Sequence, residues 1–264
     1  MPRLPGPESN VIVYPIRSSL ARPGDSIPGL FSKALAKNRM RVESKDIVAV
    51  SSKIVGIAEN RIRYLDGIRP GPQARRLARK HSITRSFAQA VLDEADTVVG
   101  GVKGVLLTVK NGDAVANAGI DRKNAPAGAV VLWPRNADLS AKKIRQSIRR
   151  KSGKNVGVVI VDSRVSPMRL GTTGFAIGCA GFEAVEDLRG GVDLFGRRIE
   201  ITFRAIADGI AASAQFVMGE ASDQIPFAIV RDAPVSLGSG HGIRPAKLAW
   251  SRCLYMSQIS RAND

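Results

Sequence analysis

The stretch VGVVIVD, residues 156–162, is the clearest buried strand in the sequence. A short and continuous apolar run of this kind is typical of a strand in the core of a sheet. The run ends on Asp162. We therefore expect a carboxylate at the tip of a buried strand, and the segments around it decide which fold that strand belongs to.

The segment immediately before this strand is the densest cationic block of the chain, KKIRQSIRRKSGK at 142–154, and it contains no acid. The apolar residues Leu139, Ile144 and Ile148 predict a helix that docks through a narrow stripe and keeps its cations in solvent. Nucleic-acid binding is the alternative interpretation. The low aromatic content favours the solvated face, because no aromatic residue interleaves with the block to stack on bases.

Toward the N-terminus, the chain is predicted to form a strand, a turn, a helix and a second β-like run. VIVYPI (11–16) is the strand, RPGD (22–25) is the turn, and the helix runs from Ile27 to about Asn38. DIVAVSSKIVGIAE (46–59) is the β-branched run. The serines and the lysine in its middle are expected to face a cleft.

The middle of the chain is predicted to hold a basic helix, from Gln73 to about Leu92, and several short strands. Asn111-Gly112 marks a hairpin turn, because both residue types tolerate the positive φ that a tight turn needs. The strand-like runs cover residues 97–99, 104–109, 113–117 and 127–134.

Beyond the buried strand, residues 171–182 are glycine-rich but strand-like, and residues 190–201 are typical of a hairpin. From Phe203 to Met218 the apolar residues recur every three to four positions, which predicts a helix that Gly219 ends. A last strand is expected at 225–230, and the residues from Ser236 onward show no strong period.

Strands outnumber helices in this reading and do not alternate with them one for one, which argues against a Rossmann-type succession. We therefore predict an α+β fold with mixed or antiparallel sheets and packed helices, arranged in two lobes. A length of 264 residues allows one large domain or two modest ones, and the apolar fraction of 44% indicates a folded globular protein.

The composition excludes several kinds of site. Cys179 and Cys253 are too few for a disulfide framework, and no C-x-x-C spacing exists. With only His81 and His241, a histidine-rich metal site or a Ser-His-Asp triad is not expected.

The chain has no leader-like start and no stretch of membrane-spanning length, so we expect a cytoplasmic protein. Its net charge of +17 predicts attraction to polyanions.

Three acidic residues share a style of placement. Asp121 follows a run of small residues in VANAGIDRKNAP (115–126), Asp162 ends a strand, and Glu220 follows a helix stop. Hard oxygen ligands of this sort suit Mg²⁺ or Mn²⁺, ions that commonly hold nucleotide phosphates. Turn capping and surface solvation are the alternative. Neither a P-loop nor a dinucleotide fingerprint is present.

Several blocks taken in order resemble the coenzyme F420-0:gamma-glutamyl ligase family, and the similarity runs from about residue 11 to residue 235. Each block is weak alone, whereas their order is distinctive. The blocks are SSKIVGIAENR (51–61), ANAGIDRKN (116–124), VDSRVSPMRLGTTGFAIG (161–178), AGFEAVEDLRGGVDLFGRRI (180–199) and VMGEASDQIP (217–226).

The resemblance implies a catalytic unit over 1–235 and a C-terminal tail over 236–264, in a homodimer with an α+β fold. It implies a GTP-dependent ligase that joins L-glutamate to a carboxylate of the deazaflavin precursor. GTP would phosphorylate that carboxylate, and the glutamate amine would attack the acyl phosphate. Two divalent ions, Mg²⁺ or Mn²⁺, would neutralise the phosphate charge.

The resemblance also implies roles for individual residues. Asp121 and Asp162 would bind one metal ion, and Ser163 and Glu220 would serve the second. Asn124 would contact the nucleotide. The other residues expected around the nucleotide are Ser52, Lys53, Gly219, Glu220, Ala221, Ser222 and Asp223.

The chain departs from the family pattern in places. Ile57 stands where the family has a lysine near the nucleotide, and Lys53, Lys123 or Arg164 are possible substitutes. Near the N-terminus, the family has a segment with Leu-Pro that contacts the nucleotide, and this chain has residues 18–21 at the matching place instead. These departures leave open a relative that ligates another carboxylate, or a non-catalytic descendant that binds a nucleotide or a polyanion.

Overall fold

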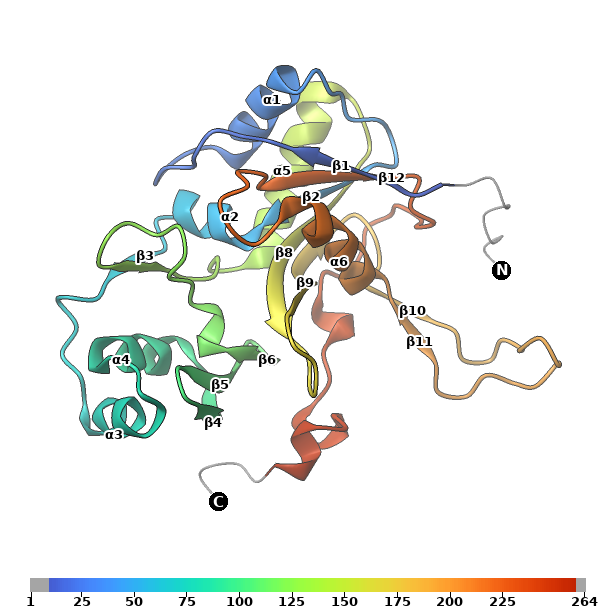
Figure 1. The fold of residues 1–264 in the computed structure, drawn as a ribbon. Coiled ribbons are helices and arrows are strands. Elements are labelled where there is room, and N and C mark those ends of the chain that lie inside the picture. The colour runs from blue at the N-terminus through green and yellow to red at the C-terminus, as the bar shows by residue number, and fades with distance from the viewer. Residues whose placement is uncertain (1–9, 260–264) are drawn as a thin grey trace. The chain divides into compact units, whose positions relative to one another are not determined.

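The computed structural model describes residues 10–259, and the fold is α+β, as the sequence predicts. The described residues form two compact units. Unit 1 holds residues 10–59, 134–163 and 172–246, and unit 2 holds residues 60–133, 164–171 and 247–259. Figure 1 labels helices and strands of both units.

Unit 1 is built on a five-stranded mixed sheet, in which the stretch 156–162 supplies a central strand, as expected. β8 (Gly157–Val165) pairs in parallel with β2 (Ile47–Ser51), whose other neighbour, β12 (Phe227–Arg231), is antiparallel. β12 in turn pairs antiparallel with β1 (Ile12–Ile16). The strand order is β1-β12-β2-β8-β9, with β9 spanning Thr172–Ala180.

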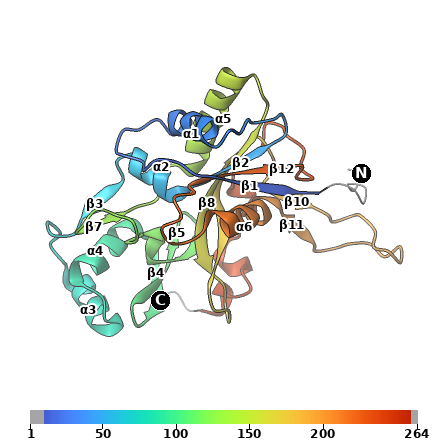
Figure 2. The ribbon, with the colours of Figure 1, turned by 45° about the horizontal axis from the view of Figure 1, so that its top comes forward.

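Helices pack on both faces of this sheet. α6 (Ile206–Met218) shares a buried cluster with Ile47, Ala49 and Val159, which project from one face. α1 (Ile27–Lys37) packs on the other face, where the ring centroids of Phe31 and Phe227 lie 5.1 Å apart. α5 (Ala137–Ser152) lies beside α1 in both views (Figures 1 and 2). Helices therefore cover both faces of this mixed sheet.

The glycine-rich composition of β9 lets these helices approach closely. A Cβ atom on Gly174 would lie 2.3 Å from the Ala211 carbonyl oxygen in α6. A Cβ atom on Gly178 would lie 2.5 Å from the Ala137 carbonyl carbon in α5. These positions can hold only glycine unless a helix moves.

The run 46–59 is only half a strand, so the sequence-based prediction of a continuous β segment is wrong. β2 ends at Ser51, and α2 (Ser52–Ala58) follows directly. Ser52, Val55 and Gly56 are the buried residues of α2, and their spacing follows the period of a helix. The β-branched composition obscured that change of period.

Unit 2 holds two helices where one was predicted. α3 (Pro72–His81) ends because Ser82 adopts a left-handed φ of 53°. α4 (Arg85–Glu94) begins after Thr84, whose Oγ1 accepts a hydrogen bond from Phe87 N at 3.4 Å. A C-cap at Ser82 and an N-cap at Thr84 therefore break the predicted helix.

The predicted short strands of unit 2 are present. β4 (Thr97–Val102), β5 (Val105–Lys110) and β6 (Asp113–Ala116) form an antiparallel sheet. The turn at Asn111-Gly112 has the expected positive φ values, 52° and 81°. The strand predicted at 127–134 is shorter, and β7 (Ala129–Val131) pairs with β3 (Ile62–Tyr64).

The hairpin predicted at 190–201 is the outer part of a longer one in unit 1. β10 (Val185–Asp187) pairs with β11 (Phe203–Ala205), so α6 begins at Ile206 and not at residue 203. Further out, the two arms are joined by a β-bridge between Val192 and Arg198 and by backbone hydrogen bonds, such as that from Gly190 N to the Ile199 carbonyl at 2.9 Å. Figures 1 and 2 both show this hairpin extending away from the sheet of unit 1.

Two further predictions concern α5 and the tail. Ile144 and Ile148 are buried as expected, but Leu139 is 46% exposed, and Ala141 takes its place in the stripe. After Ser236 the described chain forms three 3-10 turns, Arg244–Ala246, Trp250–Arg252 and Met256–Gln258. Among the described residues, none of the helices combines the length and apolarity needed to cross a membrane.

Candidate active site

One edge of the unit 1 sheet collects most of the residues that the sequence predicts for nucleotide and metal. Ser51, the last residue of β2, is in register with Val161 of the parallel strand β8. Ser52 and Asp162 are the next residues along the chain, so they lie at the same edge of the sheet. Carboxyl ends of parallel strands are where open α/β sheets commonly bind ligands.

Two loops reach the same edge from neighbouring strands. β12 runs antiparallel to β2, with Phe227 opposite Val50, so the loop over 219–226 enters the sheet at this edge. Ser51 N donates to the Pro226 carbonyl at 2.9 Å, and Ser18 N donates to the Gln224 carbonyl at 3.1 Å. The segment 18–21, the start of α2 and the 219–226 loop are therefore tied together.

The side chains at this edge differ in burial. Ser52 is only 6% exposed, whereas Lys53 is half-buried. Asp162 and Ser163 are also half-buried, and Asp162 Oδ1 accepts a hydrogen bond from Ser163 N at 2.8 Å. This bond orients the carboxylate. The prediction that the strand ends on Asp162 is wrong, because β8 continues to Val165, and Asp162 is the first residue beyond the part of β8 that pairs with β2.

The loop after α6 is exposed, and its own acids shape it. Gly219 ends the helix with φ 74°, as predicted, and a Cβ atom there would lie 2.3 Å from Asp223 Oδ2. Asp223 Oδ2 accepts from Ala221 N at 3.1 Å, and Glu220 Oε1 accepts from Gln215 Nε2 at 2.6 Å. Asp223 thus closes the turn, and Glu220 is oriented by α6.

Asp121 and Asn124 lie in unit 2, on the segment that follows the 3-10 turn Asn117–Gly119. Asp121 forms backbone hydrogen bonds to Val131, and its Oδ1 accepts from Lys123 N at 2.6 Å. The carboxylate therefore caps a turn, which is the alternative that the sequence left open. Asn124 adopts a left-handed φ of 56° in the same turn.

The small residues before Asp121 have a packing reason that the sequence analysis missed. A Cβ atom on Gly119 would lie 2.2 Å from the indole ring of Trp133. Ala118 is fully buried, and its N–H donates to Thr108 Oγ1 at 2.8 Å. The slim segment fits against its own unit, and this packing accounts for its small side chains.

The structure thus gathers part of the predicted set. Ser52, Lys53, Asp162, Ser163 and the loop residues 219–223 share one edge in unit 1, while Asp121 and Asn124 belong to unit 2. In the described part of the chain, His, Cys, Asp and Glu side chains form no cluster of three that could hold a metal ion. Shared metal binding by Asp121 and Asp162 stays a prediction.

Several charged residues of the quoted blocks have structural partners that sequence reasoning could not find. Glu59 accepts from Arg135 N at 3.1 Å and from Ser140 Oγ at 2.5 Å. Arg61 forms an ion pair with Glu94 at 2.8 Å, and Glu94 also pairs with Lys110. These partners lie far apart in sequence, so no local signal reveals them.

Cys179 is buried and offers no nucleophile. Burial, together with the nearby carboxylates of Asp138 and Glu183, raises the pKa of its thiol to about 12. A thiolate is the reactive form of cysteine, and it is not populated near neutral pH at this site.

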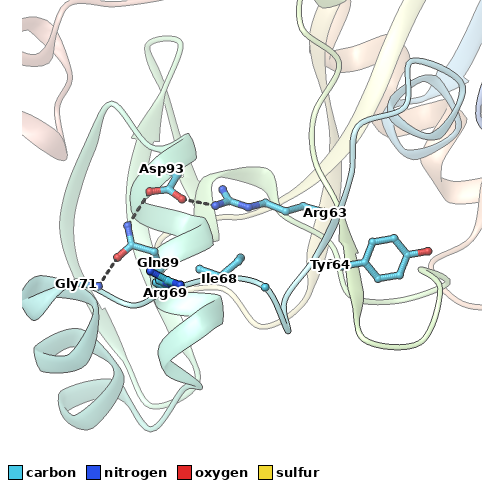
Figure 3. A pocket seen from close by; sticks show the side chains of 8 residues that line it. Arg63, Tyr64, Ile68, Arg69, Gly71, Gln89 and Asp93 are labelled. Carbon is cyan, nitrogen blue, oxygen red and sulfur yellow. Dashed lines mark hydrogen bonds and ion pairs between the residues drawn. The ribbon is translucent and has the colours of Figure 1, made fainter.

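A separate hollow of about 610 Å³ lies in unit 2 and contains none of the predicted site residues. A chain of hydrogen bonds crosses it (Figure 3). Gly71 N donates to Gln89 Oε1 at 2.8 Å, Gln89 Nε2 donates to Asp93 Oδ1 at 2.7 Å, and Arg63 pairs with Asp93 at 2.5 Å. The polar groups in it thus largely satisfy one another.

Comparison with known proteins points to one family. Residues 15–232 match the family described as F420-0:Gamma-glutamyl ligase. The chain is 38% identical over 227 residues to the coenzyme F420:L-glutamate ligase of Archaeoglobus fulgidus, covering 86% of this chain and 89% of that protein. The proteins of the same name from Methanopyrus kandleri and Methanocaldococcus jannaschii are 35% and 41% identical, over 86% and 77% of this chain and 88% and 83% of theirs.

Proposed function

Because the chain belongs to the F420-0:gamma-glutamyl ligase family, we propose that it joins L-glutamate to the F420-0 precursor through an amide bond, driven by GTP. The relatives carry the name coenzyme F420:L-glutamate ligase and are similar over most of the chain. The match covers both compact units. We expect the reaction to take place in the cytoplasm.

The observation that carries this proposal is the convergence at the edge of the unit 1 sheet. A buried hydroxyl at Ser52, a cation at Lys53 and a carboxylate at Asp162 lie just beyond the point where the parallel pairing of β2 with β8 ends, on its carboxyl side. The exposed 219–223 loop follows the same edge. This combination of hydroxyl, cation and carboxylate suits a nucleoside triphosphate and its metal ion.

The proposed reaction has two steps. In the first, an oxygen of the acceptor carboxylate attacks the γ-phosphorus of GTP, the bond to the β-phosphate oxygen breaks, and GDP leaves. In the second, the glutamate amine attacks the acyl carbon, the carbon–oxygen bond to phosphate breaks, and the amine loses a proton. Positioning and charge neutralisation are the main contributions a protein makes to phosphoryl transfer.

Mg²⁺ or Mn²⁺ fits the donors that are present. Asp121, Asp162, Ser163 and Glu220 offer only hard oxygen ligands, the type these ions prefer. A cage of three protein carboxylates is not formed in the described chain, and Mg²⁺ is usually held by one or two carboxylates with water and phosphate completing the shell. When bound, the ions would neutralise charge on the phosphates. The hydrogen bond from Ser163 N would hold the Asp162 carboxylate in position for the metal ion.

Lys53 is the best replacement for the lysine that Ile57 displaces. It lies in the first turn of α2, directly after the strand end, whereas Ile57 lies near the end of that helix. We expect Lys53→Met to raise the KM for GTP and lower kcat, and Lys53→Arg to restore less than the full rate, because a guanidinium is not a compact cation. Steady-state kinetics measure both, and an unchanged KM in Lys53→Met would remove this role.

The direct test of the proposed function is a reconstituted reaction. Purified protein is incubated with GTP, Mn²⁺, L-glutamate and F420-0, and the products are followed as GDP and as the mass gain of one glutamate. Omission of glutamate is the control for GTP hydrolysis alone. Absence of both products, with folded protein and with any carboxylate acceptor supplied, overturns the ligase assignment.

The replacement at Ile57 supports a second candidate, a diverged relative that binds a nucleotide or ligates another carboxylate. Calorimetry with GTP separates these outcomes. Binding of GTP without turnover on F420-0 favours the diverged relative, whereas turnover on F420-0 removes it.

The proposed enzyme is a homodimer, and the long hairpin is the proposed contact. Leu194, Phe195 and Ile201 are 101%, 81% and 85% exposed on its arms. A two-stranded ribbon of this kind is marginally stable alone in water. A second copy that packs on the same ribbon through a two-fold axis would bury these side chains.

A further inference from the structure

The basic block of the sequence forms an exposed cationic helix face that the ligase site does not use. α5 buries Ala141, Ile144 and Ile148 against its own unit and turns its cations outward. No acid occurs between Asp138 and Asp162 in the sequence. The exposed cations on α5 and just after it are Lys142, Lys143, Arg149, Arg150, Lys151 and Lys154.

A second row of cations lies beside this helix. α1 contacts α5 and runs next to it in Figures 1 and 2. The loop that follows α1 is joined to the segment just after α5 by a hydrogen bond from Lys45 N to the Asn155 carbonyl at 2.8 Å. The exposed cations of α1 and this loop are Lys33, Lys37, Arg39, Arg41 and Lys45. Both rows together are called the basic face.

The charges of the basic face are not neutralised within the described residues. None of its side chains forms an ion pair, a hydrogen bond or a ring contact there. The acids that lie nearby in sequence have other partners. Glu43 and Asp46 pair with Arg231 at 2.6 and 2.9 Å, and Asp138 accepts hydrogen bonds from Cys179 N and Ile243 N.

The cations of α5 also affect the pKa of a neighbouring side chain, Arg145. Arg145 lies on the same helix but is half-buried, and its guanidinium donates to the Val156 carbonyl at 2.8 Å. Burial, followed by repulsion from Arg149, lowers the pKa of Arg145. A positive potential therefore accumulates at this end of α5.

Interaction with the helix dipole explains only some of the cations in the basic face. Cations in the last turn of α5, such as Arg149, Arg150 and Lys151, favourably oppose the negative end of the helix dipole. Lys142 and Lys143 precede that turn, and the row on α1 and its loop belongs to other elements. The helix dipole of α5 therefore does not explain why these other positions are cationic.

The basic face lies away from the candidate active site. Residues 39–45 and 149–154 precede β2 and β8, so they lie at the amino ends of these strands. Ser52 and Asp162 lie on the opposite, carboxyl side of the same pair of strands, just beyond their last paired residues. A ligand on the basic face therefore leaves the predicted nucleotide edge open.

We propose that the basic face binds the phosphate backbone of double-stranded nucleic acid without sequence specificity. Neutralisation of phosphates by rows of Lys and Arg supplies nearly all of such binding. Residues 32–45 and 137–154 contain no aromatic side chain, so stacking on unpaired bases is absent. Leu139 is the one exposed large apolar residue on α1 or α5, which is too little to insert into a lipid surface.

The test measures anisotropy of a labelled DNA duplex two helical turns long, across a salt series, with the full chain. We expect the logarithm of the binding constant to fall linearly with the logarithm of salt concentration. The variant Arg149→Glu, Arg150→Glu, Lys154→Glu should bind at least about tenfold more weakly. Its salt slope should be shallower by about 3, because each phosphate that a cation neutralises contributes roughly 0.9 to the slope. The ligase rate should not change.

The matched control reverses the same number of exposed cations on α3, as Arg75→Glu, Arg76→Glu, Arg79→Glu. This variant carries the same change in net charge, and its salt slope should stay that of the wild type. The variant Arg149→Gln, Arg150→Gln, Lys154→Gln repeats the test if the charge reversal disturbs folding, which circular dichroism reports.

Four results overturn the proposal. They are the absence of duplex binding at low salt, loss of binding in the α3 variant but not in the α5 variants, tighter binding of the single strand than of the duplex, and capture by phosphatidylserine vesicles without binding to the duplex.

Discussion

At the residue scale, unit 2 contains a largely buried group of charges. Glu94 is 13% exposed, lies against Arg61 and Lys110, and Lys110 is itself buried. Burial alone would raise the pKa of Glu94, but the hydrogen bond and charge of Lys110, with those of Arg61, lower it. We expect Glu94→Gln to reduce the free energy of unfolding by about 3–5 kcal/mol, because it leaves a buried ammonium unpaired. Urea denaturation measures this.

The same carboxylate predicts a pH dependence. The pKa of Glu94 is lower in the folded state than in the unfolded state. As the pH falls, the unfolded chain therefore takes up a proton at this group before the folded chain does. The stability it contributes is therefore fully present above the unfolded pKa, about 4.3, and is lost as pH falls through the folded pKa. The loss should be absent in Glu94→Gln and retained in Asp187→Asn, a change at an exposed ion pair.

Asp162 is the residue whose loss should matter most for catalysis. Asp162→Asn keeps the size of the side chain but removes the charge that would hold a metal ion, so we expect kcat to fall by at least about a hundredfold with an unchanged melting temperature. Asp232→Asn is a matched control that lies just after β12 in the same unit and should keep full turnover. Full turnover in Asp162→Asn, and in the corresponding Asp121 variant, would refute the metal assignment.

At the element scale, substitutions at two glycines distinguish the effect of close packing from the effect of helix propensity. Gly174→Ala forces a Cβ atom against the Ala211 carbonyl in α6, and we expect a loss of about 1–3 kcal/mol in the free energy of unfolding. Gly209→Ala lies within α6 with no atom within 4 Å, so helix propensity should stabilise it by about 0.5–1 kcal/mol. Thermal and urea unfolding give both signs. Equal effects in the two variants would mean that α6 packs differently against β9.

At the scale of the whole molecule, the hairpin should determine assembly. Leu194→Ser with Phe195→Ser removes the apolar end of the ribbon, and we expect the dimer to become a monomer in light scattering. Met168→Ser with Leu170→Ser changes two equally exposed apolar residues outside the hairpin, and it should leave the dimer intact. A wild-type protein that is monomeric at every accessible concentration would contradict the assembly proposal itself.

The local patterns of the sequence were sufficient for most single elements. The apolar run 156–162, the Asn111-Gly112 turn and the Gly219 helix stop are all confirmed. Each depends on a backbone or burial preference of a few adjacent residues. The ordered blocks also identified the family, because order along a chain is itself a property of the sequence. Local patterns failed at 46–59, where a β-branched composition continues from a strand into a helix.

The sequence by itself therefore determined the α+β class, most strands and helices, and the family. The tertiary structure decided which residues meet. Parallel pairing of β2 with β8 brings Ser52 and Asp162 to one edge, and packing around Trp133 explains the small residues before Asp121. It also decided that Glu94 neutralises Lys110 and that the basic face stays unpaired within the described chain. Those outcomes depend on contacts between residues far apart in the chain, for which the period and composition of a short segment carry no information.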